Sequence, residues 1–239
     1  MTDRSTDAAA GDGPSDGPVW TIVLAAGSGR RYGSAPKQYE QLGGERVIDR
    51  SLAIARAAAD HIVVVLARGD EEIGRALVDE GLADVAVTGG AERADSVRAG
   101  LAVVDEDAAV VVVHDAARPL ASAELHRAVV AAAHAGADAV IPAVAVTDTI
   151  KRIRHDGHGR SIVVETPDRS MLVAVQTPQA FRAEVLRAAH ASGADATDDA
   201  ALVEAVGGTV VVIDGEATNL KITGPDDLAV AHVLLEGLG

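Results

Sequence analysis

The fold of this chain is constrained most by a regular alternation of short β-branched apolar runs with segments of helical periodicity. The run Ile62 to Ala67 is continuously apolar, which is typical of a strand buried on both faces. Strand patterns occur at 19–25, 62–67, 84–88, 109–113, 139–146 and 209–213, and helical patterns at 45–59, 71–80, 92–104, 122–135, 180–191, 198–206 and 225–235. Alternation at this spacing predicts an α/β fold, with a mostly parallel sheet and helices on both faces.

One segment, residues 147–175, interrupts this alternation. It combines charged residues with two apolar patches and the turn His155-Asp156-Gly157-His158-Gly159, which predicts a β-hairpin arm protruding from the sheet. Because an isolated two-stranded arm is marginally stable, we expect it to pack on another subunit. Residues 1–18 lack periodicity and are expected to form a disordered tail, so 19–239 would be one domain that includes the arm.

The charge of the chain limits its partners. Among 239 residues, 36 are acidic and 21 basic, a net charge of −15. This disfavours nucleic acids and anionic membranes as partners, because both attract basic surfaces. The absence of cysteine excludes disulfides, thiolate metal sites and cysteine nucleophiles. With neither a signal-peptide pattern nor a membrane-length apolar run, we expect a cytoplasmic protein. A small phosphorylated ligand remains compatible, because it needs only a local cluster of positive groups.

The first strand pattern ends in a loop suited to phosphate. Gly27-Ser28-Gly29 is followed by Arg30 and Arg31 and then by Lys37, one of only three lysines in the chain. Glycines let backbone N–H groups turn toward an anion. The loop is not a dinucleotide fingerprint, because Tyr32 stands at the third glycine position, and it lacks the Gly-Lys-Ser/Thr of a Walker A loop. It therefore predicts a triphosphate-holding loop of another type; a tight strand-to-helix turn with solvated arginines is the plainer alternative.

Several motifs occur in a defined order along the chain. They are Ala25-Ala26-Gly27-Ser28-Gly29-x-Arg31 with Pro36-Lys37-Gln38-Tyr39, the stretches 89–97 and 114–119, Asp148-Thr149-Ile150-Lys151, Gln176-Thr177-Pro178-Gln179, Thr197-Asp198-Asp199-Ala200 and Asn219-Leu220-Lys221-Ile222-Thr223. Together they resemble the 2-C-methyl-D-erythritol 4-phosphate cytidylyltransferase family, from about residue 19 to the C-terminus. The resemblance implies a Rossmann-like nucleotidyltransferase sheet. It also implies transfer of a cytidylyl group from CTP to the polyol phosphate, with release of pyrophosphate.

The resemblance also implies roles for individual residues. Arg31 and Lys37 would stabilise the transition state, Lys221 would lie near the attacking phosphate, and Arg169 would hold the substrate phosphate. Residues implied in nucleotide binding are Ala25, Ala26, Gly27, Gly29, Gly89, Gly90, Ala91 and Ser96, and those implied in substrate binding are Asp115, Arg118, Thr149 and Thr177. Asp115 would also lie near a divalent metal, most simply Mg²⁺. The arm would reach a neighbouring subunit of a homodimer, so that Arg169 and Thr149 act in trans.

Some alternatives stay open at this point. The related activity of a ribitol 5-phosphate cytidylyltransferase would use the same phosphate and base motifs, and a CTP-binding regulator without catalysis would retain the nucleotide site alone. Asp115 could instead pair with Arg118 across the turn. His114 is interpreted as a packing residue, and the cluster Asp195, Asp198 and Asp199 as a helix start. His155 and His158 have a metal-like spacing but no third ligand nearby.

Overall fold

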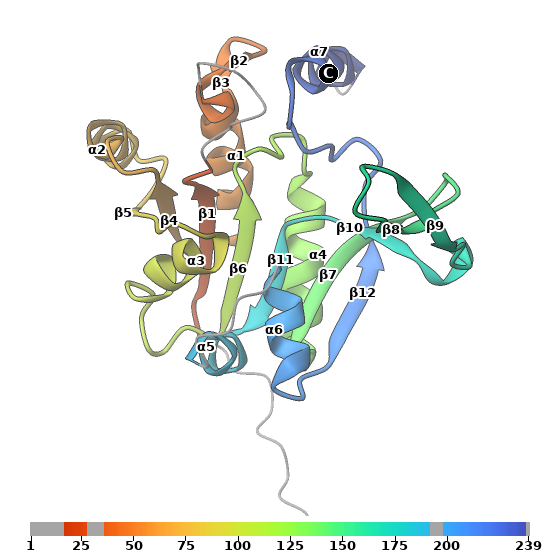
Figure 1. Cartoon of the computed structure of the whole chain (residues 1–239). Coiled ribbons are helices and arrows are strands. Elements are labelled where there is room, and N and C mark those ends of the chain that lie inside the picture. Colours follow the sequence, from red (N-terminus) through yellow and green to blue (C-terminus); the bar gives the residue numbers. More distant parts are fainter. Residues whose placement is uncertain (1–16, 28–35, 192–197, 238–239) are drawn as a thin grey trace, which may run out of the picture.

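A computed structural model describes residues 17–27, 36–191 and 198–237 of the chain (Figure 1). In these residues an eight-stranded sheet has the order β10-β7-β11-β6-β1-β4-β5, and β12 also pairs with β7. The strands are β1 Val19–Ala25, β4 His61–Leu66, β5 Val85–Thr88, β6 Val110–Asp115, β7 Ala139–Ala145, β10 Val173–Val175, β11 Gln179–Arg182 and β12 Val210–Asp214. β1 runs parallel to both β4 and β6, and β4 is parallel to β5. The predicted α/β fold with a mostly parallel sheet is confirmed.

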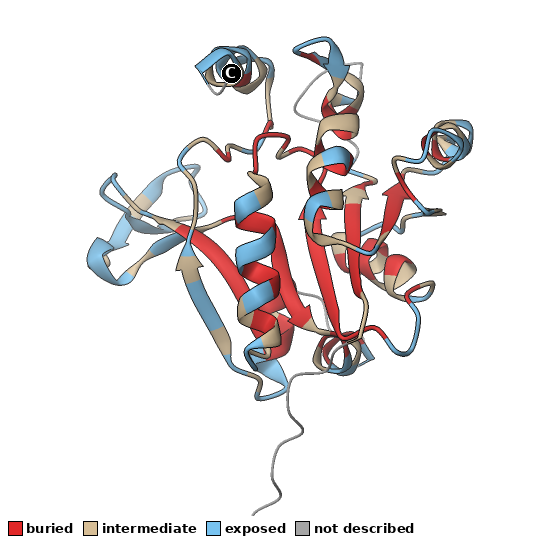
Figure 2. Ribbon diagram, turned by 180° about the vertical axis from the view of Figure 1, so that it is seen from behind, coloured by how far each residue is buried: buried red, intermediate tan, exposed pale blue. Residues whose placement is uncertain are grey.

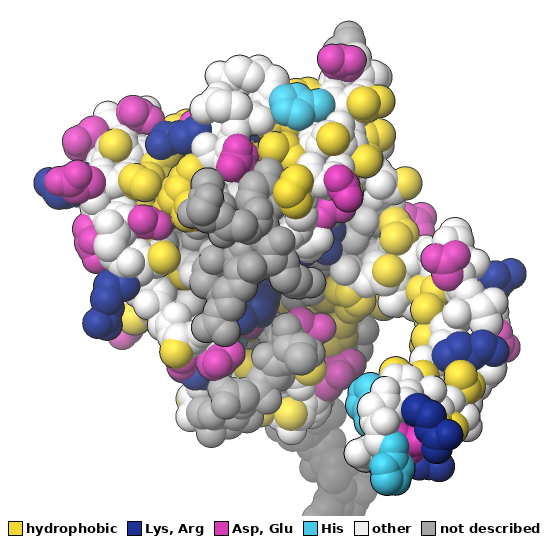
Figure 3. Space-filling model, turned by 45° about the horizontal axis from the view of Figure 1, so that its top comes forward, with side chains coloured by type: hydrophobic (Ala, Val, Ile, Leu, Met, Phe, Trp, Pro, Cys, Tyr) yellow, Lys and Arg dark blue, Asp and Glu magenta, His cyan; other side chains and the backbone are white. Residues whose placement is uncertain are grey.

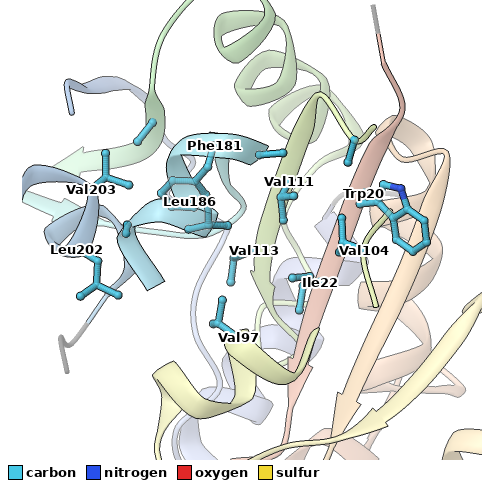
Figure 4. Packing of buried hydrophobic residues seen from close by; sticks show 14 of the residues in the cluster. Trp20, Ile22, Val97, Val104, Val111, Val113, Phe181, Leu186, Leu202 and Val203 are labelled. Carbon is cyan, nitrogen blue, oxygen red and sulfur yellow. The ribbon is translucent and has the colours of Figure 1, made fainter. Parts of the chain in front are cut away.

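Helices cover both faces of this sheet. They are α1 Val47–Ala55, α2 Glu71–Asp79, α3 Arg93–Leu101, α4 Ala123–His134, α5 Ala183–Ala191 and α6 Asp199–Ala205. A further helix, α7 Pro225–Gly237, packs against β2 and the start of α1 instead of the main sheet, and single 3₁₀ turns are η1 Lys37–Tyr39, η2 Arg56–Ala58 and η3 Arg169–Met171. Successive strand residues point to opposite faces. Ile22 of β1 therefore packs in the cluster with Val97 of α3 and Leu186 of α5 (Figure 4). The next residue, Val23, packs on the other face with residues of α1 and α2. Figure 2 shows the buried strands between helices whose outer sides are exposed.

Two of the predicted helices begin later than expected. The segment 180–191 opens with β11, which pairs antiparallel with both β6 and β7, and only then becomes α5. Phe181 of β11 is fully buried in the core. The four residues of β11 are too few for their pattern to distinguish a strand from a helix. They form a strand because the position between β6 and β7 offers backbone partners on both sides. Likewise, the segment 45–59 opens with β3 Glu45–Arg46, which pairs with β2 Gln41–Leu42 before α1 begins.

The predicted hairpin is present. Strands β8 Arg152–His155 and β9 Ser161–Glu165 pair antiparallel and form a separate two-stranded sheet. The hairpin stands away from the main body, and cationic and histidine side chains gather at its end (Figure 3). The last part of the expected arm, β10, is instead an edge strand of the main sheet on β7. Of the predicted tail, residues 1–16 lie outside the described residues, and β1 begins at Val19 as expected.

The length and hydropathy of a helix determine whether it can cross a bilayer. Over residues 17–27, 36–191 and 198–237, the longest helix is α7, and no helix is both long and apolar enough to cross a bilayer.

Candidate active site

A cavity of about 640 Å³ opens at the carboxyl ends of the central parallel strands. Its wall is formed by the residues that directly follow β1, β4, β5 and β6. The chain proceeds from β1 outward to β4 and β5 and then returns to place β6 on the other side of β1. Ligands of open α/β sheets bind in the crevice at such a reversal of strand order. The cavity is therefore where the fold by itself places a binding site.

The cavity collects most of the residues implicated from sequence. Ten of them line it: Ala25, Ala26, Gly27, Lys37, Gly89, Gly90, Ala91, Ser96, Asp115 and Lys221. Thr149 and Arg169 belong to the arm segment, and they do not line this cavity in their own chain; the Arg169 guanidinium donates to the carbonyl oxygen of Thr147 over 2.7 Å. Thr177 and Arg118 lie behind the cavity wall. Gly29, Arg30 and Arg31 fall outside the described residues.

Two glycines after β5 bring separate loops into close contact. A Cβ atom on Gly89 would lie 2.6 Å from Cβ of Ala26, and one on Gly90 would lie 2.1 Å from Cβ of Asp95. Both distances are shorter than van der Waals contact. A larger residue at either glycine would therefore push away Ala26 of the loop after β1 or Asp95 of α3. The Ser96 hydroxyl braces this turn, accepting from the Gly90 N–H and donating to the Glu92 carbonyl, each over 3.3 Å. The loop is thus held with its backbone exposed to the cavity.

Asp115 and Lys221 form the principal ion pair of the cavity. Lys221 Nζ donates to Oδ2 of Asp115 over 2.7 Å, although the two residues are 106 positions apart. Burial alone would raise the pKa of the Asp115 carboxyl, but the positive charges of Lys221 and Arg93 outweigh that effect and lower its pKa. Asp115 is therefore ionised at neutral pH. Its backbone N–H donates to the Thr177 hydroxyl over 3.0 Å, which fixes the end of β6.

Arg118 contacts both Asp115 and the loop that carries Lys221. Its Nε lies 3.9 Å from Asp115, at the limit of an ion pair, whereas its Nη1 donates to the Asn219 carbonyl over 2.7 Å. Asn219 is fully buried, and its side-chain amide donates to Oε1 of Gln176 and to the carbonyl oxygen of Thr177. This network anchors the loop that carries Lys221. The pairing of Asp115 with Arg118 across the turn is thus present at 3.9 Å, and Lys221, at 2.7 Å, is the closer partner of the carboxylate.

Lys37 reaches the cavity from η1. The neighbouring side chain of Gln38 is buried and donates to the Ala25 carbonyl over 2.9 Å. The Tyr39 hydroxyl donates to Asp70 over 2.6 Å. These two bonds tie η1 to β1 and to the start of α2, so Lys37 is presented on a fixed turn. Among the described residues, the cations that line the cavity are Lys37, Arg68, Arg93 and Lys221, and the acidic residues are Glu92 and Asp115. This excess of positive charge favours an anionic ligand.

His114 does not line the cavity. It is fully buried, its ring packs edge-on against His126 at 4.8 Å between centroids, and its Nδ1 lies 3.2 Å from the Thr177 hydroxyl. Burial lowers the pKa of His114 to about 4, so the imidazole is neutral at neutral pH. These contacts agree with the interpretation of His114 as a packing residue rather than a base.

Arg93 is a cavity residue that was not assigned a role from sequence. Its Nη1 donates to Oδ2 of Asp199 over 2.6 Å, and Nε2 of His190 lies 3.0 Å from the other oxygen of the same carboxylate. Asp198, in contrast, accepts from the Ala201 N–H and caps α6, as the helix-start interpretation predicted. Asp195 lies outside the described residues. The sequence signal for Arg93 is its position three residues after Gly90, within the motif 89–97.

The acidic side chains of the cavity determine whether it can hold the expected Mg²⁺. Within the part of the chain that the structure describes, no three histidine or acidic side chains gather as a ligand set. Asp115 contributes one carboxylate, and one of its oxygens is engaged by Lys221. Magnesium commonly binds through one or two carboxylates together with substrate phosphates and water. The residues present therefore fit a Mg²⁺ ion that is brought with a triphosphate, but not a fully protein-bound metal.

The fold and cavity together define an α/β enzyme of the nucleotidyltransferase class, with glycine-rich loops and lysines around a site for an anionic ligand. Comparison with known proteins identifies the family. The family model described as IspD, 2-C-methyl-D-erythritol 4-phosphate cytidylyltransferase, matches residues 19–237, and the chain belongs to this family. It is thus a cytidylyltransferase, as expected from its motifs.

Individual relatives agree with this assignment. The chain is 47% identical to 2-C-methyl-D-erythritol 4-phosphate cytidylyltransferase of Rhodococcus jostii, over 92% of this chain and 96% of the relative. It is 50% identical over 90% of its length to the bifunctional enzyme IspD/IspF of Anaeromyxobacter dehalogenans, of which it spans only 56%. The 4-diphosphocytidyl-2C-methyl-D-erythritol synthase of Anaerococcus prevotii superimposes with a TM-score of 0.80 at 31% identity, covering 92% of this chain and 96% of that one.

Proposed function

We propose that this chain transfers the cytidylyl group of CTP to 2-C-methyl-D-erythritol 4-phosphate, giving 4-CDP-2-C-methyl-D-erythritol and pyrophosphate. The observation that carries this proposal is the convergence of Lys37, Lys221 and Asp115 with the Gly89–Gly90 turn around one cavity. Both reactants are anions and repel each other in water. A site that holds them together with preorganised positive charge therefore supplies most of what the reaction needs.

The proposed reaction is one in-line displacement at phosphorus. An oxygen of the polyol phosphate attacks the α-phosphorus of CTP and forms the new P–O bond. The bond from the α-phosphorus to the bridging oxygen breaks, and pyrophosphate leaves with that electron pair. No base is required, because the attacking phosphate is already ionised. In this scheme Lys37 and Arg31 stabilise charge on the α-phosphate and the leaving group, and Lys221 orients the attacking phosphate.

We also propose that Mg²⁺ takes part, held by Asp115 and the triphosphate. The ion would neutralise phosphate charge when bound. The lowered pKa of Asp115 supports this role, because an ionised carboxylate is available to a cation at neutral pH. Chelation should abolish pyrophosphate release, and added Mg²⁺ should restore it; full activity after exhaustive chelation would remove the metal from the scheme.

A homodimer with shared active sites is the third part of the proposal. Several large apolar side chains of the arm segment are exposed, among them Ile153, Val163, Val164 and Met171, the last 82% exposed. An exposed apolar surface of this kind favours contact with another chain. Arg169 and Thr149 lie in the same segment and outside their own chain's cavity. Their position supports delivery to a neighbouring subunit, where Arg169 would hold the polyol phosphate.

The direct test is pyrophosphate release with CTP, Mg²⁺ and one of two acceptors. We expect release with 2-C-methyl-D-erythritol 4-phosphate and little with ribitol 5-phosphate. Release with ribitol 5-phosphate alone would replace the proposed acceptor, and CTP binding without release from either would favour a regulator. The cytoplasmic location expected from sequence stays a prediction, which fractionation of cells that produce the chain would test.

A further inference from the structure

The carboxylate of Asp199 is the most deeply buried charge near the cavity. It is 1% exposed and lies at the start of α6, behind the cavity wall. A buried carboxylate is costly unless it is paired and hydrogen-bonded. Asp199 meets this condition through one bond to Arg93 and one to the buried His190. Because each of its oxygens has its own partner, the carboxylate cannot turn without losing one of them.

The position of Arg93 is unfavourable for the helix it begins. Arg93 is the first residue of α3, where the helix dipole favours acidic rather than basic side chains. Helix stability therefore does not explain an arginine there. Its side chain is 28% exposed and lines the cavity, while one end of its guanidinium is bonded to Asp199. A planar guanidinium held at one end keeps its remaining donors in a fixed direction.

The three residues come from separate helices on one face of the sheet. Arg93 belongs to α3, His190 to α5 and Asp199 to α6, and Figure 1 shows these helices on the same side. Arg93 and Asp199 are 106 positions apart in sequence. The contact thus links the segment after β5, which includes Gly89 and Gly90, to the start of α6. Such a link serves the cavity, because it fixes a cation in its wall.

We propose that Asp199 is a positioning residue that holds Arg93 in the cavity wall, where the guanidinium contacts the bound nucleotide. His190 keeps the Asp199 carboxylate in the orientation that Arg93 requires. This inference deepens the proposed function and rests on it, because the ligand used to test it is CTP. Arg93 is the group in contact with the ligand, and Asp199 acts only through Arg93.

The experiment measures CTP affinity by calorimetry without the acceptor, and KM and kcat with it. The variants are Asp199→Asn, Arg93→Ala, Arg93→Lys and the double variant Asp199→Asn with Arg93→Ala. Asp138→Asn is the matched control: Asp138 also accepts from an arginine, Arg182, and from a backbone N–H, but it lies just before the first residue of β7 and does not line the cavity. Thermal unfolding of every variant is followed in parallel.

We expect Asp199→Asn to weaken CTP binding about 10-fold or more, the effect of losing one charge-assisted contact, and to raise the KM for CTP more than it lowers kcat. The double variant should bind CTP no more weakly than Arg93→Ala alone, because Asp199 acts only through Arg93. Arg93→Lys should also weaken binding, because lysine lacks the two-ended fork. Asp138→Asn should bind CTP as the wild type does.

Each contrary result has a definite meaning. Unchanged CTP affinity in folded Asp199→Asn, or losses that add in the double variant, would overturn the positioning role. If Asp199→Asn does not fold, Arg93→Lys decides the matter, and wild-type affinity in that variant would overturn the contact with the nucleotide. If the wild-type chain itself binds no CTP, the failure lies with the proposed function and not with the role of Asp199.

Discussion

At the scale of single residues, function in this chain follows from where a few charges are placed. Only three lysines occur among 21 basic residues, and two of them, Lys37 and Lys221, line the cavity. Each is held by local structure: Lys37 by the turn that Gln38 and Tyr39 fasten, and Lys221 by its ion pair with Asp115. A lysine ammonium is a compact charge that suits phosphate oxygens.

Replacing Lys37 tests the proposed stabilisation of the transition state. We expect Lys37→Ala to lower turnover by at least about 10²-fold, as the loss of one preorganised charge does in other enzymes. Pyrophosphate release at saturating substrates measures the effect. Arg75→Ala is the control, because Arg75 is an exposed cation on α2 that does not line the cavity. Turnover of Lys37→Ala close to that of the control would remove Lys37 from the mechanism.

The Asp115–Lys221 pair makes a prediction about pH. Burial raises the pKa of Asp115, and the positive charge of Lys221 is the strongest of the effects that lower it. Lys221→Ala removes that effect, so the pKa of Asp115 should rise relative to the wild type. A ¹³C NMR titration of the Asp115 carboxyl measures this shift. In the wild type, the lowered pKa of Asp115 stabilises the folded state at pH values above the ordinary pKa of a carboxyl group. This stabilisation is lost as the pH falls through the lowered pKa. The stability gap between wild type and Lys221→Ala should therefore be widest at neutral pH and shrink on acidification. A titration midpoint that does not move would contradict the assigned pair.

At the scale of elements, the sequence pattern predicted the parallel strands and the hairpin well, but missed the short antiparallel strand β11 of the main sheet. β1, β4 and β6 consist mostly of apolar residues, and burial on both faces is typical of the central strands of a parallel sheet. β11 is only four residues long and contains Gln179 and Arg182. Nothing local separates it from the helix that follows, and it became a strand because β6 and β7 both present it with unpaired backbone groups.

Phe181 tests how much β11 contributes to the core. Its side chain is fully buried and packs with residues of β6 and α5 (Figure 4). Phe181→Ala should lower the free energy of unfolding by about 3–5 kcal/mol, the usual cost of such a cavity. Urea unfolding measures the loss, and Phe181→Leu, which retains most of the volume, should cost much less. Equal and small losses in both variants would show that β11 is not part of the cooperative core.

At the scale of the whole molecule, the arm is the feature that a single chain does not explain. Its hairpin has no place in the main sheet, and its apolar side chains are exposed. A second subunit would cover them. The same arrangement would bring Arg169 to a cavity that it does not reach in its own chain.

Mixing two inactive variants tests this arrangement. Arg169→Ala and Lys37→Ala subunits, exchanged at equal concentration, should form mixed dimers in which one of the two sites has both residues intact. With random pairing, about a quarter of the wild-type activity should return, because half of the dimers are mixed and each has one complete site. Native mass spectrometry verifies the exchange. No return of activity after proven exchange would place Arg169 outside a shared site.

The sequence by itself determined the class of fold, the motifs of the family and most of the residues that line the cavity. These features are local, because periodicity, glycine placement and residue chemistry act within a few positions. The tertiary structure alone decided that Lys221 is a closer partner of Asp115 than Arg118 is, that Asp199 and His190 contact Arg93 or its partner, and that β11 enters the sheet antiparallel. Each of those outcomes joins elements far apart in the chain, so it depends on which partners packing brings within a few ångströms and not on any local preference.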